Sequence, residues 1–327
     1  MTWRTLPAAV LAAALTMTSV LASAPVRAAT LTLACDAVGL AAEVCLEGAQ
    51  QWARQNGHAI KLIPVPRSGS RRLDLYKQLL GAQSPAIDIY MIDIVWPGVL
   101  ARSFVDLSKP AAATIGQHFP GIVRNNTVNG RLIAMPWFTD AGLMFYRKDL
   151  LARYKLPVPA TWDELERTAA RIQDAERGAG KRDFWGYVWQ ARAYEGLSCA
   201  ALEWMVGHGG GAIVREDGQV TIDNPRASSA LQMARNWIGT ISPKSVLTSD
   251  EDDALGAFSA GKVAFMRNWP YAWAIANGPA SGIRGQVGIA PLPRGPGGIS
   301  GATLGGQQLA VSRFSRNQAL AIDLVMY

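Results

Sequence analysis

The sequence holds few of the residues on which metal sites and nucleophilic catalysis depend. It has three histidines, and His58, His118 and His208 lie far apart with no carboxylate or thiol at ligand spacing. No G-x-S-x-G motif occurs, and the glycine-rich stretches at 209–211 and 291–298 do not precede a helix as phosphate-binding loops do. We therefore expect no metal site, no bound nucleotide and no other cofactor.

A concentrated basic surface is also missing. The formal net charge is +7, but the basic residues are dispersed, and the pair Arg71 and Arg72 stands close to Asp74. Proteins that bind nucleic acids gather lysine and arginine on one face or along one helix. The dispersed charge argues against a nucleic-acid partner.

Long hydrophobic runs are absent after the N-terminus. The one apolar stretch extends from Leu6 to Ala22, follows Arg4 and is interrupted by polar residues at 16, 18 and 19. It falls short of the roughly 20 apolar residues that cross a bilayer, which disfavours a membrane anchor. A short segment with the small residues of a signal-peptide cleavage site follows it. We interpret residues 1–28 as a signal peptide cleaved after Ala28, which would deliver the protein to the periplasm or another extracytoplasmic compartment.

Two of the three cysteines, Cys35 and Cys45, lie close together in the sequence. Because closely spaced cysteines of exported chains usually pair, we predict a disulfide that joins the first strand to the first helix. An alternative makes Cys35 the lipid-carrying cysteine of a lipoprotein, but Thr32 stands where that motif requires an aliphatic residue. Cys199 is expected to be a buried thiol.

Strand and helix patterns alternate over the first hundred residues. This order predicts a parallel α/β sheet, in which ligands collect at the carboxyl ends of the strands. A further strand-like stretch at 132–146 precedes a helix that Thr161 and Glu164 are expected to cap. About 300 residues follow the signal peptide, a length that favours two lobes. The predicted early elements are strands at 30–34, 60–65 and 87–92 and helices at 39–54 and 71–82.

The stretch 261–273, GKVAFMRNWPYAW, combines aromatic rings with polar side chains. A sugar offers apolar C–H faces that lie on aromatic rings and hydroxyl groups that take directed hydrogen bonds. Trp269, Tyr271 and Trp273 could supply the ring surfaces, and Arg267 and Asn268 the polar contacts. The alternative is that Trp269 and Trp273, four residues apart, form one apolar helix face packed into a core.

Two carboxylates stand in settings that also favour a binding site. Asp93 directly follows a predicted buried strand, where it would either accept hydrogen bonds from ligand hydroxyls or cap the next helix. Asp140 lies among apolar residues, so it should pair with an arginine or face a wet cleft. Trp137 and Phe138 beside it could form another stacking surface or ordinary core.

Five motifs in order carry a resemblance to a known family. The chain resembles the extracellular solute-binding proteins of sugar ABC importers, and most of all their trehalose/maltose-binding branch. The resemblance implies an α/β, two-lobed periplasmic-binding-protein fold, with a ligand cleft between the lobes and crossover segments near 137–142 and 302–306. The N-terminal lobe would comprise 29–139 plus 302–327, and the C-terminal lobe 140–301. The motifs are YMIDIVWPGVL (90–100), MPWFTDAGLMFYRKDLL (135–151), WGYVWQARAYEGLSC (185–199), FMRNWPYAW (265–273) and APLPRGPGG with ATLGG (290–306).

The resemblance also implies a set of ligand contacts. Asp93 and Asp140 would bind sugar hydroxyls, Trp269 would stack on a sugar ring, and Phe138 stands where the family often has an aromatic residue. The remaining predicted contacts are Tyr271, Arg72 or its neighbour Arg71, Gly306 and Gln307.

Three departures from the family pattern stand out. Relatives commonly have an acidic residue near positions 40–42, where this chain has Leu-Ala-Ala. They also commonly have a tryptophan directly after the LGG motif, where this chain has Gln307. Family members also continue beyond the equivalent of residue 327. We therefore expect a C-terminally truncated chain in which the C-terminal lobe lacks its completion.

The function that the resemblance implies is transport and not catalysis. The chain would be the exported, monomeric substrate-binding component of an ABC sugar importer. It would bind an α-linked disaccharide such as trehalose or maltose, or a longer oligosaccharide, and deliver it to membrane permease subunits. The alternative is a secreted glycoside hydrolase that uses Asp93 and Asp140, because two carboxylates across a glycosidic bond are what hydrolysis requires.

Overall fold

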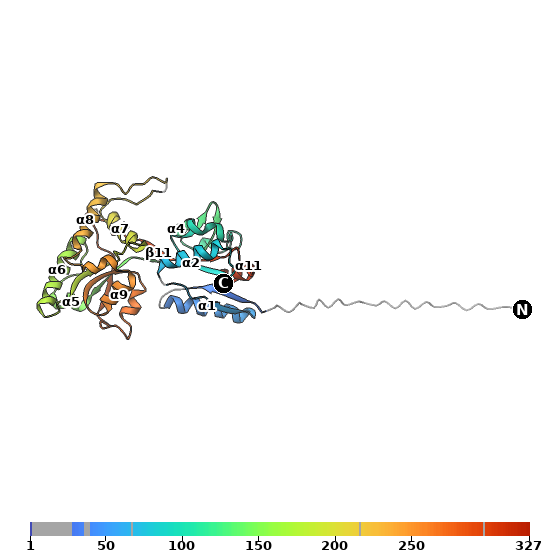
Figure 1. Ribbon diagram of the computed structural model, residues 1–327, viewed down its shortest axis with the longest axis horizontal. Coiled ribbons are helices and arrows are strands. Elements are labelled where there is room, and N and C mark those ends of the chain that lie inside the picture. The colour runs from blue at the N-terminus through green and yellow to red at the C-terminus, as the bar shows by residue number, and fades with distance from the viewer. Residues whose placement is uncertain (2–27, 36–39, 67, 216, 297) are drawn as a thin grey trace.

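The computed structural model divides the chain into two lobes, each built on its own β-sheet (Figure 1). It describes residues 1, 28–35, 40–66, 68–215, 217–296 and 298–327. The predicted signal peptide, apart from its two end residues, lies outside the described residues. No helix within the described ranges is long and apolar enough to cross a membrane.

The first lobe contains a five-stranded sheet in the order β2-β1-β3-β11-β6. Its strands β1, β2 and β3 are parallel, as the alternating pattern predicted, whereas β11 runs antiparallel to both β3 and β6. Strand β2 stops earlier than expected because Pro64 and Pro66 offer no backbone N–H for the ladder. The strands are β1 (Thr30–Ala34), β2 (Ala59–Leu62), β3 (Ile89–Asp93), β6 (Met135–Ala141) and β11 (Leu304–Val311).

Helices and a small hairpin complete this lobe. The disulfide predicted between Cys35, which follows β1, and Cys45 is present, with 6.6 Å between the Cα atoms. It ties the end of the first strand to the first helix. The helices are α1 (Leu40–Asn56), α2 (Gly69–Gly81), α3 (Pro97–Leu100), α4 (Pro120–Asn126) and α11 (Gln318–Met326), and the hairpin strands are β4 (Thr127–Val128) and β5 (Arg131–Leu132).

The second lobe contains a four-stranded sheet in the order β10-β7-β9-β8. Strand β9 is buried along its whole length, and an aromatic core that includes Trp162, Trp204 and Trp237 packs nearby. The capping box of Thr161 and Glu164 is confirmed at the start of α6. The elements are β7 (Leu143–Arg147), β8 (Trp185–Val188), β9 (Val263–Asn268), β10 (Val287–Ala290), α5 (Lys148–Tyr154), α6 (Trp162–Gly178), α7 (Glu195–Gly207), α8 (Pro225–Trp237), α9 (Glu251–Ser259) and α10 (Ala272–Ala276).

Within the residues that the structure describes, the chain passes between the two sheets at two places. It leaves the first sheet after β6 and enters the second at β7, with Gly142 between them, and it returns through 291–303 into β11. The amide of Gly142 donates to the carbonyl of Thr303 at 3.3 Å, so the two crossover segments lie side by side. The stretch 132–146, expected as one strand-like unit, is therefore split among strands of different sheets. The residue boundaries expected for the two lobes remain a prediction.

Candidate functional site

A cavity of about 730 Å³ lies where the two lobes meet, a volume in the range of small-molecule sites. Its walls come from the end of β3 and the start of α2 in the first lobe, from α7, α9 and residues 269–274 in the second, and from the crossover strands β6 and β11. Eight of the predicted site residues line it: Arg72, Asp93, Phe138, Asp140, Trp269, Tyr271, Gly306 and Gln307. Arg71 does not line it, because consecutive residues of a helix point about 100° apart.

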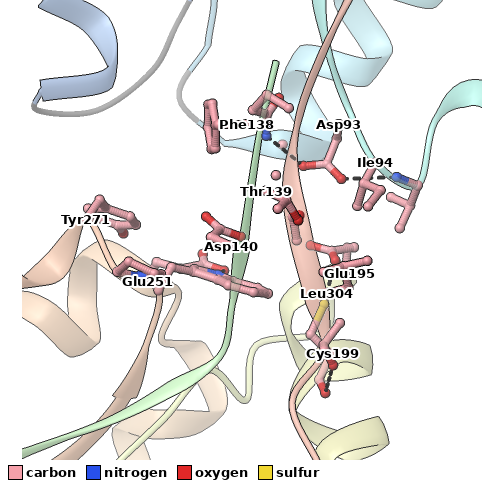
Figure 2. Close-up of a pocket in the computed structure, with 18 of the residues that line it drawn as sticks. Asp93, Ile94, Phe138, Thr139, Asp140, Glu195, Cys199, Glu251, Tyr271 and Leu304 are labelled. Carbon is pink, nitrogen blue, oxygen red and sulfur yellow. Dashed lines mark hydrogen bonds between the residues drawn. The ribbon is translucent and has the colours of Figure 1, made fainter. Parts of the chain in front are cut away.

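Asp93 stands at the first-lobe side of the cavity (Figure 2). Its Oδ1 accepts a hydrogen bond from the Val95 amide at 3.2 Å, and its Oδ2 accepts one from Gln307 Nε2 at 3.0 Å. The N-cap of α3 is Trp96, so Asp93 does not cap that helix. Burial raises the pKa of Asp93 above its usual value, and the bond to the Val95 amide opposes that effect. Gln307, which replaces the expected aromatic residue, thus orients this carboxylate.

Asp140 lies in the middle of the cavity on β6, between Asp93 and the second-lobe wall (Figure 2). Burial and the neighbouring charge of Asp93 raise the pKa of Asp140 to about 6, against the opposing effect of Arg267. Gly305 on the adjacent strand permits this arrangement, because a Cβ there would overlap Asp140 Oδ1 and lie 2.9 Å from Trp269 Cζ3. The carboxylate and the tryptophan ring therefore both adjoin the same glycine.

Trp269 forms an aromatic platform directly after β9. Arg267 Cζ lies 4.1 Å from the centroid of its ring, and Trp269 Nε1 donates to Glu251 Oε1 at 3.4 Å. These contacts fix the plane of the ring at the cavity wall. Phe138, at 5.1 Å between ring centroids from Trp137, adds apolar surface on the first-lobe side.

Three expectations for the stretch 261–273 are corrected. Arg267 and Asn268 do not supply polar contacts to the cavity, since both are at most 1% exposed, and Arg267 is paired with Glu203 behind the wall. Trp273 does not belong to a core, since it is 42% exposed and lines the cavity rim.

Reasoning from the sequence missed several polar side chains of the second lobe. Arg192 forms an ion pair with Asp250 at 2.8 Å, and the Tyr194 hydroxyl donates to Glu251 Oε2 at 2.6 Å. Glu195, at the start of α7, lines the cavity; burial and the charge of Asp93 raise its pKa to about 7. The sequence did contain the family motif at 185–199 and the acidic residues at the start of α9, but neither pattern identified a single contact residue.

The cavity is acidic and lined with aromatic rings. Its carboxylates include Asp93, Asp140, Glu195 and Glu251, and the cations among its described lining residues are Arg72 and Arg192. Carboxylates accept hydrogen bonds from hydroxyl groups, and aromatic faces cover C–H surfaces. In the part of the chain that the structure describes, no three histidine, cysteine or carboxylate side chains are grouped to hold a metal ion. The arrangement suits a hydroxylated ring that carries no net charge.

Known proteins are similar to this chain in sequence and in architecture. The profile of the bacterial extracellular solute-binding protein family matches residues 42–327. A probable ABC transporter-binding protein of Deinococcus radiodurans is 50% identical over 308 residues, which cover 94% of this chain and 73% of that protein.

Solved structures agree with this match. The maltose-bound MalE3 of T. maritima superposes with a TM-score of 0.84 at 40% identity, over 91% of this chain and 76% of that one. The GacH receptor of Streptomyces glaucescens, solved unliganded and with acarbose, gives 0.79 at 25% identity, over 92% and 75%. The predicted two-lobed fold is confirmed.

Proposed function

The chain belongs to the family of bacterial extracellular solute-binding proteins, and we propose that it is the sugar-binding component of an ABC importer. Its ligand would be an α-linked disaccharide such as trehalose or maltose, bound in the cavity between the lobes. The relative solved with maltose and the receptor solved with acarbose support a glycoside ligand.

The observation that carries this proposal is the placement of Trp269 beside Asp140. The ring and the carboxylate both adjoin Gly305 and line one cavity, so a sugar could stack on the indole while its hydroxyl groups donate to Asp140. Asp93, held by Gln307, would accept hydrogen bonds from hydroxyls at the first-lobe end. Tyr271, Phe138 and Arg72 would complete the contacts.

We also propose that the protein is exported, that it transfers its sugar to a permease and that it does not catalyse a reaction. Residues 1–28 would be removed as a signal peptide, and the monomeric protein would pass its sugar to permease subunits in the membrane. It would need no cofactor and would leave the glycosidic bond intact.

One observation favours a second candidate, a secreted glycoside hydrolase. A carboxyl with a pKa of about 6 next to a second carboxylate resembles the general acid of a glycosidase, and Asp140 and Asp93 have that relationship. Incubation of the purified protein with trehalose, maltose and sucrose, followed by chromatography of the sugars, separates the candidates. We expect stoichiometric binding and unchanged sugar. Release of glucose that Asp140→Asn abolishes would establish the hydrolase instead.

A further inference from the structure

A buried ion pair lies behind the wall of the cavity. Arg267 Nε donates to Glu203 Oε2 at 2.9 Å, and Arg267 Nη2 donates to the other oxygen of the same carboxylate. Gln190 adds a hydrogen bond from Nε2 to the Arg267 carbonyl at 3.0 Å. Burial alone would lower the pKa of Arg267, but Glu203 raises it above its usual value, so the guanidinium keeps its charge.

On its cavity side, this pair supports the platform that we assign to the sugar. The guanidinium of Arg267 lies 4.1 Å from the ring centroid of Trp269, a cation–π distance. Because Glu203 holds the guanidinium through two parallel hydrogen bonds, the guanidinium cannot turn without breaking one of them. The plane of the indole is therefore set by a rigid group beneath it.

On its other side, the pair touches both crossover segments. The amide of Thr303, just before β11, donates to Glu203 Oε1 at 3.1 Å. Gly142, between β6 and β7, lies directly against the pair: a Cβ there would overlap Glu203 Oε1 and lie 2.7 Å from Arg267 Nη2. Gly142 and Thr303 are also joined by their own backbone hydrogen bond. One carboxylate thus contacts both crossover segments, through a hydrogen bond at Thr303 and through close packing at Gly142.

We propose that Arg267 and Glu203 are positioning residues that couple the sugar platform to the hinge. A ligand stacked on Trp269 contacts a ring that lies on Arg267, and Glu203, the partner of Arg267, accepts a hydrogen bond from the Thr303 amide and lies against Gly142. Occupation of the platform and the angle between the lobes are therefore linked. The coupling rests on the proposed function in so far as the ligand stacks on Trp269.

A purely structural role would not explain the choice of residues. Two charges taken out of water pay a large desolvation cost, and replacing such a pair with apolar side chains of similar volume is often neutral or stabilising. Folding alone therefore gives no reason to place a charged pair at this point. Contact with both crossover segments and with the platform does, because an apolar pair could not accept the hydrogen bond from the Thr303 amide.

The test is a double variant, Arg267→Met with Glu203→Met, which removes the pair without leaving one charge buried alone. We expect a folded protein whose affinity for the sugar bound by the unchanged protein falls at least about tenfold, by calorimetry, as loss of one stacking contact would cause. In a double-mutant cycle that combines this variant with Trp269→Ala, the two losses of binding free energy should not add, because the pair acts through that ring. Glu176→Gln, at a buried carboxylate outside the cavity lining, is the control and should leave affinity unchanged.

A second readout needs no ligand. Spin labels at Lys77 on α2 and Arg167 on α6, both exposed, report the distance between the lobes by electron spin resonance. The double variant should broaden the distribution of that distance. The coupling would be overturned if the double variant kept its sugar affinity, if its loss of affinity added to that of Trp269→Ala, or if the distribution of the inter-lobe distance did not change. If the unchanged protein binds no sugar, the proposed function fails, and the distance distribution still decides whether the pair fixes the hinge.

Discussion

At the scale of single residues, Trp269 is the side chain on which the sugar assignment depends most. Burying one aromatic face contributes about 1.5–3 kcal/mol, so Trp269→Ala should weaken sugar binding by roughly 10- to 100-fold, as measured by calorimetry. Trp185 is a matched control, since it also carries a guanidinium over its ring, that of Arg177 at 4.4 Å, but lies outside the cavity lining. Equal effects of Trp269→Ala and Trp185→Ala would remove the stacking role.

Replacing Asp140 should change stability and sugar affinity in opposite directions. Its pKa is about 6 in the folded protein and near 4 in an unfolded chain, so the folded protein keeps a proton that the unfolded chain loses between those pH values. Stability therefore falls as the pH rises through this window, by up to about 3 kcal/mol. Asp140→Asn should remove that fall, making the protein more stable at pH 7, while it weakens sugar binding about tenfold through loss of a charged acceptor.

The measurement is denaturant unfolding at pH 4 and pH 7, with Asp149→Asn as the control. Arg147 donates to Asp149 at 2.7 Å and outweighs burial, so the pKa of Asp149 is lowered and its ionised form stabilises the fold. Asp149→Asn should therefore destabilise at pH 7. An Asp140→Asn protein with lower stability than the unchanged protein at pH 7 would contradict the account.

Side-chain chemistry and the family motifs together predicted the residues that line the cavity better than they predicted the side chains behind them. Asp93, Asp140 and Trp269 stood out because their chemistry suits a sugar and the family motifs contain them. Arg267 looked like a ligand donor because its partner, Glu203, is 64 positions away in the chain and no local pattern pairs them. Burial of a charged residue becomes visible only when the fold brings its partner to it.

At the scale of elements, strand β11 must carry glycine where it passes Asp140 and Trp269. Gly305→Ala places a methyl group against both side chains, and overpacking of this kind costs about 1–3 kcal/mol. We expect sugar affinity to fall about tenfold while the far-ultraviolet circular dichroism is unchanged. Gly256→Ala on α9, where a Cβ would meet nothing within 4 Å, should not lower affinity. An unaffected Gly305→Ala protein would show that the ring and the carboxylate do not act together.

The disulfide between β1 and α1 gives a second prediction at this scale. Cys35 and Cys45 are 10 positions apart, and closing a loop of that length stabilises the folded state by about 2–3 kcal/mol. Alanine at both positions should lower the free energy of unfolding by that amount. A reducing agent should have the same effect on the unchanged protein and no effect on the double alanine variant. Cys199 is free and serves as the internal control, because Cys199→Ala should leave the response to reduction intact.

Element boundaries show where sequence patterns reach their limit. The parallel arrangement of β1, β2 and β3 followed from the alternation of strand and helix patterns, and the cap at Thr161 from its spacing to Glu164. The division of 132–146 did not, since β6 and β7 read as one continuous apolar pattern and join different sheets. Gly142 marks the division only because Glu203 and Arg267, distant in sequence, leave no room for a side chain there.

At the scale of the whole molecule, the described residues form two lobes, each with its own sheet (Figure 1). An acidic, aromatic cavity lies where the lobes meet. Polar groups from the first lobe and a platform from the second face the same space, so a ligand held by both would favour approach of the lobes. Such an arrangement would hold the proposed sugar from two sides.

The most direct test of this account is a calorimetric titration of the folded protein with trehalose, maltose and sucrose in turn. We expect at least one of these disaccharides to bind at one site per molecule, and the sugar recovered afterwards to be unchanged. Absence of binding heat with all three sugars, in protein shown by circular dichroism to be folded, would contradict it.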